Sequence, residues 1–220
     1  GYTVSPDGKL IAVLEGFHIQ KVWGFDSSIE IADLGQIPKE LQYPYRLVRL
    51  SPDGTKVVRA IELNDPDPKR RDHRIEVVSV QSGRVTFTHL STELHAFEFS
   101  GDGGRLAIAE GDRIMIVRPD SGEEITTVNV LQSGVTDMSL DQYGEILCAV
   151  SADQQLVTLW NVGTSNVLAT FKTVHADVVR VAISPTARWL AIATSDGNVQ
   201  VWDLAGAQQE LQNVGLEWQE

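Results

Sequence analysis

One pattern recurs five times along the 220 residues of this chain, and it limits the possible folds more than any other feature. Each copy holds a short apolar run, a polar turn, and then further apolar runs of strand length. The copies place their first turn at Ser5, Ser51, Ser100, Leu140 and Ser184. This spacing of 40 to 49 residues suits four short strands per copy, with no helical periodicity between them. The chain is therefore predicted to be all-β, a β-propeller of four-stranded antiparallel blades with five blade repeats.

The best-preserved copy is His175–Leu204, HADVVRVAISPTARWLAIATSDGNVQVWDL. It predicts strands at Val178–Ile183 and Trp189–Ala193, and a third strand over 199–204. Residues typical of tight turns, Ser, Pro, Asp and Gly, separate these strands. No fourth apolar run of strand length follows, so this blade lacks an outer strand of its own.

The repeats divide the chain into one predicted domain, residues 1–220, with five blades and a tail. The blades are expected at about 1–44, 45–93, 94–133, 134–174 and 175–206, and the tail at 207–220. Ala, Gln, Glu and Leu dominate the start of the tail and favour a helix. A short C-terminal helix is therefore predicted over 207–213.

The number of blades in the complete ring stays open. The five copies could close as a five-bladed ring, or they could be the C-terminal part of a seven-bladed ring in a longer parent. We favour the second arrangement, because the chain starts at Gly1 inside a strand-like run and the last copy lacks an outer strand. An unpaired strand edge is an aggregation liability that proteins normally cover.

The charge of the chain excludes several classes of partner. A net charge of -12 and a pI near 4.8 argue against nucleic acid and against an anionic membrane surface, since both attract basic proteins. No apolar stretch approaches the ~20 residues of a membrane span. The single cysteine, Cys148, fits a reducing compartment, so we expect a cytoplasmic protein without cofactors.

The residues around His175, Ser195-Asp196 and Val201–Leu204 resemble the WD-repeat family, and Trp160-Asn161 matches the same ending. The resemblance implies that His175, Asp196 and Trp202 form a buried hydrogen-bonded network that holds the blade together. It therefore assigns His175 and Asp196 to structure and not to acid–base chemistry. By this prediction, truncating Trp202 costs roughly 3–5 kcal/mol. The position that carries a hydroxyl in the family is Ile192 here, and whether Thr194 substitutes for it stays open.

Two further stretches resemble bacterial propellers. The Ser-Pro-Asp-Gly turns of the first copies are similar to those of the TolB group. The tail after Leu204 is similar to the ends of propellers in large bacterial multidomain proteins, some of which carry a Ser/Thr kinase domain. These resemblances imply a bacterial protein that is part of a larger chain or assembly.

One insertion, Glu62–His73 (ELNDPDPKRRDH), is not required by the repeat. Its cationic cluster can grip an acidic peptide or a phosphate, although a solvated loop without a partner is the favoured alternative. The candidate partner-binding residues are Lys69, Arg70, Arg71, His73 and Arg74.

No catalytic constellation or metal site is predicted. Aspartates recur in the first turn of the copies, at Asp7, Asp53, Asp102 and Asp141, and are expected to cap these turns through side chain–backbone hydrogen bonds. His89 and His95 flank one loop, but a metal site needs three or four ligands.

The sequence therefore predicts a non-catalytic scaffold that binds a protein or peptide. The alternative is a propeller-type hydrolase or lactonase, or a sensory accessory domain of a Ser/Thr kinase. An enzyme of this architecture is expected to gather three or more His, Asp or Glu side chains at the mouth of its channel.

Overall fold

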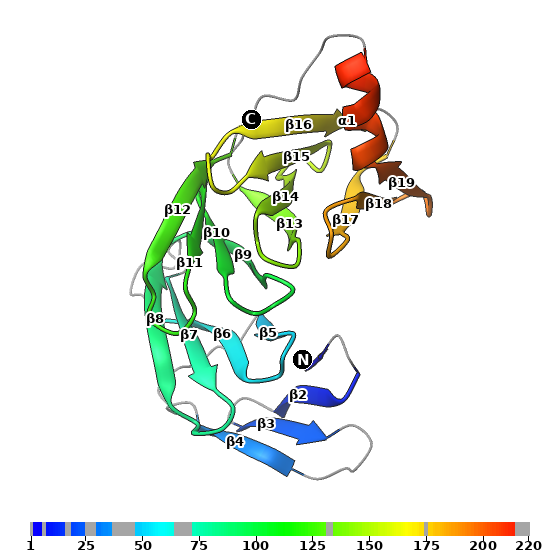
Figure 1. Cartoon of the computed structure of the whole chain (residues 1–220). Coiled ribbons are helices and arrows are strands. Elements are labelled where there is room, and N and C mark those ends of the chain that lie inside the picture. Colours follow the sequence, from blue (N-terminus) through cyan, green and yellow to red (C-terminus); the bar gives the residue numbers. More distant parts are fainter. Residues whose placement is uncertain are drawn as a thin grey trace. The chain divides into compact units, whose positions relative to one another are not determined.

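Five antiparallel sheets follow one another along the chain in the computed structural model (Figure 1). The structure describes residues 2–5, 8–15, 19–24, 30–36, 47–63, 72–130, 134–173 and 176–213. The chain divides into two compact units, residues 1–94 with 118–123, and residues 95–117 with 124–220. Each sheet matches one predicted blade, and the blades are numbered here in chain order.

The first unit contains blades 1 and 2. Blade 1 consists of β1 (Tyr2–Val4), β2 (Leu10–Glu15), β3 (Ile19–Gly24) and β4 (Glu30–Gln36). Blade 2 consists of β5 (Val48–Leu50), β6 (Lys56–Glu62), β7 (His73–Ser79) and β8 (Val85–Ser91). The two blades pack through a shared apolar cluster that includes Ala12, Val22, Val57 and Val78.

The second unit contains blades 3 and 4 and the three-stranded blade 5. Blade 3 consists of β9 (Leu94–Phe99), β10 (Leu106–Glu110), β11 (Arg113–Val117) and β12 (Glu124–Asn129). Blade 4 consists of β13 (Val135–Leu140), β14 (Ile146–Ser151), β15 (Leu156–Asn161) and β16 (Val167–Lys172). Blade 5 consists of β17 (Val178–Ile183), β18 (Trp189–Thr194) and β19 (Val199–Asp203), and helix α1 (Leu204–Asn213) follows it.

Burial along the strands explains their sequence patterns. The second strands of blades 2, 3 and 4 are nearly continuous apolar runs, and both of their faces are buried. The outer strand β16 instead alternates between half-buried and exposed side chains. Continuous runs therefore mark strands covered on both sides, and alternation marks the outer strands.

Side chains of β13 bind the backbone of β17 and so join blades 4 and 5. The Val181 N–H donates to Asp137 Oδ2 (2.8 Å), and the Ile183 N–H donates to Ser139 Oγ (3.2 Å). The Arg180 guanidinium also donates to Asp137 Oδ1, at 2.7 Å. These bonds satisfy two inner-strand N–H groups of blade 5 that pair with no strand among the described residues.

The predicted fold class is confirmed: the chain is all-β, built from propeller blades, with one short C-terminal helix. The absence of an outer strand in blade 5 is also confirmed among the described residues. Helix α1 begins at Leu204, three residues before the predicted start. Within the described residues no helix is long and apolar enough to span a bilayer.

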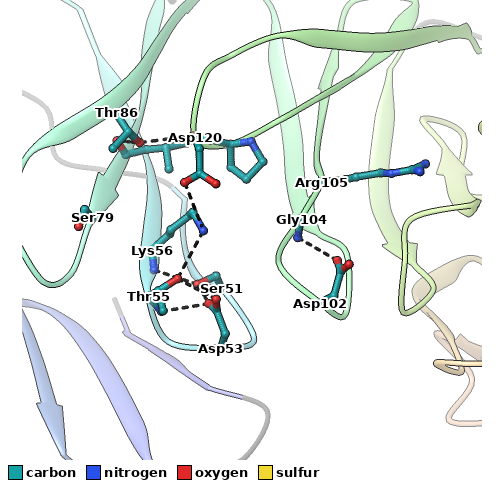
Figure 2. Close-up of polar contacts among 12 residues, drawn as sticks. Ser51, Asp53, Thr55, Lys56, Ser79, Thr86, Asp102, Gly104, Arg105 and Asp120 are labelled. Atoms are coloured by element: carbon teal, nitrogen blue, oxygen red, sulfur yellow. Dashed lines mark hydrogen bonds and ion pairs between the residues drawn. The ribbon is translucent and has the colours of Figure 1, made fainter.

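The turn between the first two strands of blade 2 shows how the recurrent aspartates act (Figure 2). The Ser51 hydroxyl donates to Asp53 Oδ1 (2.6 Å) and accepts the Lys56 N–H (2.9 Å). Asp53 Oδ1 also accepts the Thr55 N–H, at 3.0 Å. Burial alone would raise the pKa of Asp53, but the hydrogen bonds from Ser51 and Thr55 outweigh it and hold that pKa below its usual value. The predicted capping role is thus confirmed for this aspartate.

The same turn recurs in the second unit, with one change. Asp102 accepts the Ser100 hydroxyl (2.7 Å) and the Gly104 N–H (2.8 Å; Figure 2 shows the latter). Asp141 instead takes the place of the serine, because its Oδ1 accepts the Ile146 N–H five residues on (3.0 Å). The repeat position counted at Leu140 is thus one residue early, whereas the degenerate turn predicted at 141–144 is confirmed, with a carboxylate where the other copies have a hydroxyl. Asp7 lies outside the described residues.

The fourth residue of these turns has a left-handed backbone. In the turn between the first two strands of each blade this residue is Gly8, Gly54, Gly103, Gly144 or Ala187, with φ between 53° and 70°. Gln154 adopts the same conformation, at φ 58°, in the next turn of blade 4. Glycine avoids the strain that a Cβ atom causes there.

Replacing Gln154 by Gly is expected to stabilise the protein by about 0.5–1 kcal/mol, because relief of left-handed strain exceeds the entropy cost of an added glycine. Urea unfolding followed by circular dichroism measures the change. Gln155→Gly is the matched control, since Gln155 has no positive φ. The control is expected to destabilise, and a destabilised Gln154→Gly would contradict the assignment.

Candidate binding surface on the fifth blade

Strand β19 presents an uncovered apolar surface. No strand pairs with its outer edge among the described residues. The side chains from Val199 to Trp202 are exposed at four consecutive positions, so both faces of the strand are open. Val199 is 64% exposed and Val201 is 63% exposed. An exposed apolar strand with free edge groups can accept a further strand from a partner.

Trp202 differs from the sequence prediction. Instead of lying buried in a hydrogen-bonded network, its side chain is 42% exposed and packs on the Phe171 ring, with centroids 5.0 Å apart. The reason is that β19 is the last strand of its sheet in the described part of the chain, where no outer strand covers the indole. The predicted loss of 3–5 kcal/mol on truncation is therefore too large for this residue.

The other two residues of the predicted network are Asp196 and His175. Asp196 Oδ1 accepts the Thr194 hydroxyl at 2.6 Å, and its Oδ2 accepts the Asn198 amide at 2.8 Å. These bonds from Thr194 and Asn198 lower the pKa of Asp196. Thr194 thus supplies a hydroxyl that binds Asp196, which the sequence left open. His175 lies outside the described residues.

Asp203, at the end of β19, connects the blade to helix α1. Its Oδ1 accepts the Gly206 N–H (3.1 Å), as expected of a helix N-cap, and its Oδ2 accepts Arg188 Nη2 (3.1 Å). The hydrogen bond from Arg188, followed by that from Gly206, holds the pKa of Asp203 below its usual value. The early start of α1 follows from this cap.

The predicted partner-binding set is only partly described. Lys69, Arg70 and Arg71 lie outside the described residues. His73 and Arg74 lie in β7 and not in an exposed loop. His73 is 6% exposed and pairs across the sheet with Glu62 and Ser91.

Arg74 forms an ion pair with Glu76, with Nε and Oε1 2.9 Å apart. The placement of His73 in the insertion is therefore wrong, because β7 already begins at this residue. Arg74 was expected to follow the insertion in a strand, and it does. The His73 side chain is buried in blade 2, and the Arg74 side chain binds Glu76 of the same blade.

The remaining candidates for chemistry are dispersed. Nowhere in the described residues do three or more His, Cys, Asp or Glu side chains gather as metal ligands would. The His89 ring stacks on Phe87 with centroids 6.4 Å apart. Burial raises the pKa of the Cys148 thiol to about 12, so this thiol is a poor nucleophile.

The sequence predicted an unpaired edge on the last blade, but it did not single out the exposed side chains of β19 or Arg188 as surface features. A usable signal for β19 was present: Val199 and Val201 alternate in a strand that no outer strand follows. Arg188 gave no such signal, because its contacts with Asp203 and Trp189 depend on how the strands pair.

In a comparison with known protein families, one family matches the part of the chain that contains β19. Residues 165–203 match the family described as "WD domain, G-beta repeat". This range begins two residues before β16 and ends with β19, so the outer strand of blade 4 is the first strand of the matched repeat.

The chain is also similar to a Candida glabrata protein named "Putative guanine nucleotide-exchange factor SED4". The two are 27% identical over 217 residues, which cover 92% of this chain. The chain spans 20% of the length of that relative.

Proposed function

We propose that this chain, a β-propeller of the WD-repeat type, is a non-catalytic platform that binds a protein or peptide. The observation that carries the proposal is the open β19 edge: Val199, Val201 and Trp202 are exposed, and no strand among the described residues pairs with the outer backbone groups. A larger assembly or multidomain chain is its proposed setting, because the chain spans only 20% of its Candida glabrata relative.

The form of this surface favours an extended partner segment. In blades 1 to 4 the third strand pairs on its outer side with an antiparallel fourth strand. Among the described residues, blade 5 offers the same edge without that strand, and three of its four exposed side chains (Val199, Val201 and Trp202) are apolar. Backbone hydrogen bonds would give an added strand its affinity, and the valines would select its side chains.

Replacing Val201 by Lys tests this proposal, because a charge on an edge strand opposes pairing with another chain. Tagged full-length wild-type protein and variant are used to capture partners from extracts of the cells that produce the protein. Recovery is expected to fall at least about fivefold, which corresponds to roughly 1 kcal/mol, with an unchanged melting temperature.

Val167→Lys is the matched control, since Val167 is also exposed but lies on the outer strand β16. It is expected to leave recovery unchanged. Equal recovery with Val201→Lys and with wild type would contradict a binding role for β19.

The basic cluster of the insertion is a second proposed contact. Replacing Lys69, Arg70 and Arg71 by Ala is expected to weaken partner binding, and increasingly so at low salt, because exposed charges act over a distance set by screening. The melting temperature is expected to stay the same. Calorimetric melting and binding at two salt concentrations measure both effects, and a large loss of stability would contradict an exposed loop.

A second candidate function is a part in guanine-nucleotide exchange on a GTPase. It is favoured by the similarity to the Candida glabrata protein, whose name carries that activity. Release of a fluorescent GDP analogue from purified GTPases, with and without the chain, tests it. A tenfold acceleration would support exchange, and no acceleration together with partner capture would support the platform alone.

A further inference from the structure

Blades 4 and 5 pack through two different apolar faces. Cys148 on β14 and Leu159 on β15 pair across their sheet, and both are fully buried. They share one apolar cluster with Val181 and Ile183 on β17 and Leu190 on β18. We call the side of blade 4 that carries the first pair its exit face, and the side of blade 5 that carries the other three residues its entry face.

Blades 1 and 2 repeat this arrangement in the first unit. Ala12 on β2 pairs with Val22 on β3, and both residues are buried on the exit face of blade 1. They share an apolar cluster with Val48, Leu50 and Val57, which lie on the entry face of blade 2. In both units, therefore, an exit face packs on the entry face of the next blade.

The exit face of blade 5 is open. Ala191 on β18 pairs with Val201 on β19, and this pair stands where Cys148 and Leu159 stand in blade 4, next to the pair that holds the tryptophan of the third strand. Val201 and its neighbour Val199 on the same face are 63% and 64% exposed, and Ala191 is half-buried. Strand β14 is buried on both faces, whereas β18 is buried on one face only. Among the described residues, nothing covers this face as blade 5 covers blade 4.

The entry face of blade 1 is also open. Val4 on β1 pairs with Ile11 on β2, as Ile183 pairs with Leu190 on the entry face of blade 5. Tyr2 lies on the same face as Val4, because alternate residues of a strand share a face. Tyr2 is 73% exposed, Val4 is 41% exposed and Ile11 is half-buried. This face therefore has the form of an entry face without the exit face that covers those of blades 2 and 5.

We propose that two copies of this chain associate head to tail, with the exit face of blade 5 in one copy packed on the entry face of blade 1 in the other. The chain itself selects this occupant, because it already forms the same contact once in each unit and leaves one half of it open on each end blade. Exposed apolar faces of this kind mark interaction sites. The two faces are unlike, so each pair of copies leaves one face of each kind free and can add further copies.

Sedimentation equilibrium of the full chain, from low to high micromolar concentration, tests the inference. The average mass is expected to rise with concentration. It is expected to rise further with added salt, because each copy carries a net charge of -12 that opposes the contact. Ala191→Lys is expected to weaken the association at least about tenfold, since it places an unpaired charge inside the contact. Gln200→Lys is the matched control, because Gln200 is exposed on the opposite face of β19, and it is expected to leave the association unchanged.

A mixture of two variants tests whether the contact joins unlike faces. Val4→Lys blocks the entry face and keeps the exit face, whereas Ala191→Lys does the reverse. Each variant alone is expected to stay monomeric at concentrations where the wild type associates. Their equimolar mixture is expected to form a one-to-one dimer, because each variant retains the face that the other has lost. Circular dichroism of each variant confirms that the fold is retained.

A mass that stays that of one copy at every concentration would overturn the inference, and so would a mixture that is no heavier than its components. Association that is lost with Gln200→Lys but kept with Ala191→Lys would also overturn it, because the contact would then run along the edge of β19. The inference does not rest on the proposed platform function. Ala191→Lys leaves the outer edge of β19 unchanged, so capture of a different protein by this variant tests the platform alone.

Discussion

Replacing Trp160 by Ala is expected to lower the free energy of unfolding by about 3–5 kcal/mol, the range found when a large buried aromatic is truncated. Trp160 lies in β15 and is 3% exposed. It pairs with Leu147 on one side and Val167 on the other. Its removal would leave a cavity in the middle of blade 4. Urea unfolding followed by circular dichroism measures the loss.

Trp202 is the matched comparison, because it also lies on the third strand of its blade but is 42% exposed. Trp202→Ala is expected to cost about 1–2 kcal/mol, since part of the indole already contacts water. Equal losses for the two variants would mean that the indole of Trp202 is covered in solution. The outer edge of β19 would then not be open.

Replacing Glu76 by Leu is expected to cost about 3–5 kcal/mol, because it breaks a buried ion pair and leaves cationic partners behind. Glu76 is 7% exposed and lies between two arginines of blade 2. Its Oε2 lies 2.6 Å from Arg59 Nη2, and its Oε1 lies 2.9 Å from Arg74 Nε. Without the carboxylate, the two guanidinium groups would repel each other in a site with little water.

The control for this prediction is Glu30→Leu, which breaks the partly exposed pair between Lys21 and Glu30 (2.6 Å) in blade 1. Exposed pairs contribute about 0–1 kcal/mol, so the control is expected to change stability little. Urea titrations of both variants give the comparison. A loss below about 1 kcal/mol for Glu76→Leu would contradict the burial of this cluster.

Local patterns predicted most of the fold. The positions of Ser51, Asp53 and Gly54 predict a turn, because each residue type satisfies one requirement of its backbone. The structure shows that turn with the bonds expected of it. The missing outer strand of blade 5 and the helix after it were also predictable, since no apolar run follows Leu204 at strand spacing.

Exposure and strand register were less predictable, because they depend on neighbours that are distant in the sequence. Trp202 belongs to a family-like ending, yet its side chain is 42% exposed because no described strand covers the outer edge of β19. His73 looked like a loop residue, but the cross-strand partners Glu62 and Ser91 place it inside a sheet.

The candidate surface itself could be predicted only in part. An uncovered edge in the last blade follows from the repeat count, but the contacts at the end of β19 do not. In the sequence, Asp203 belongs to a Trp-Asp ending. Its role as the N-cap of α1 and its hydrogen bond from Arg188 could not be predicted from that ending, because they follow from the start of α1.

The central claim is that a partner binds along β19. Amide hydrogen exchange over Val199–Asp203, measured with and without the captured partner, tests it most directly. An added strand would bond the outward N–H groups of β19, so their exchange is predicted to slow at least about tenfold, or roughly 1.4 kcal/mol of protection. Unchanged exchange in β19 while the partner remains bound would contradict the claim.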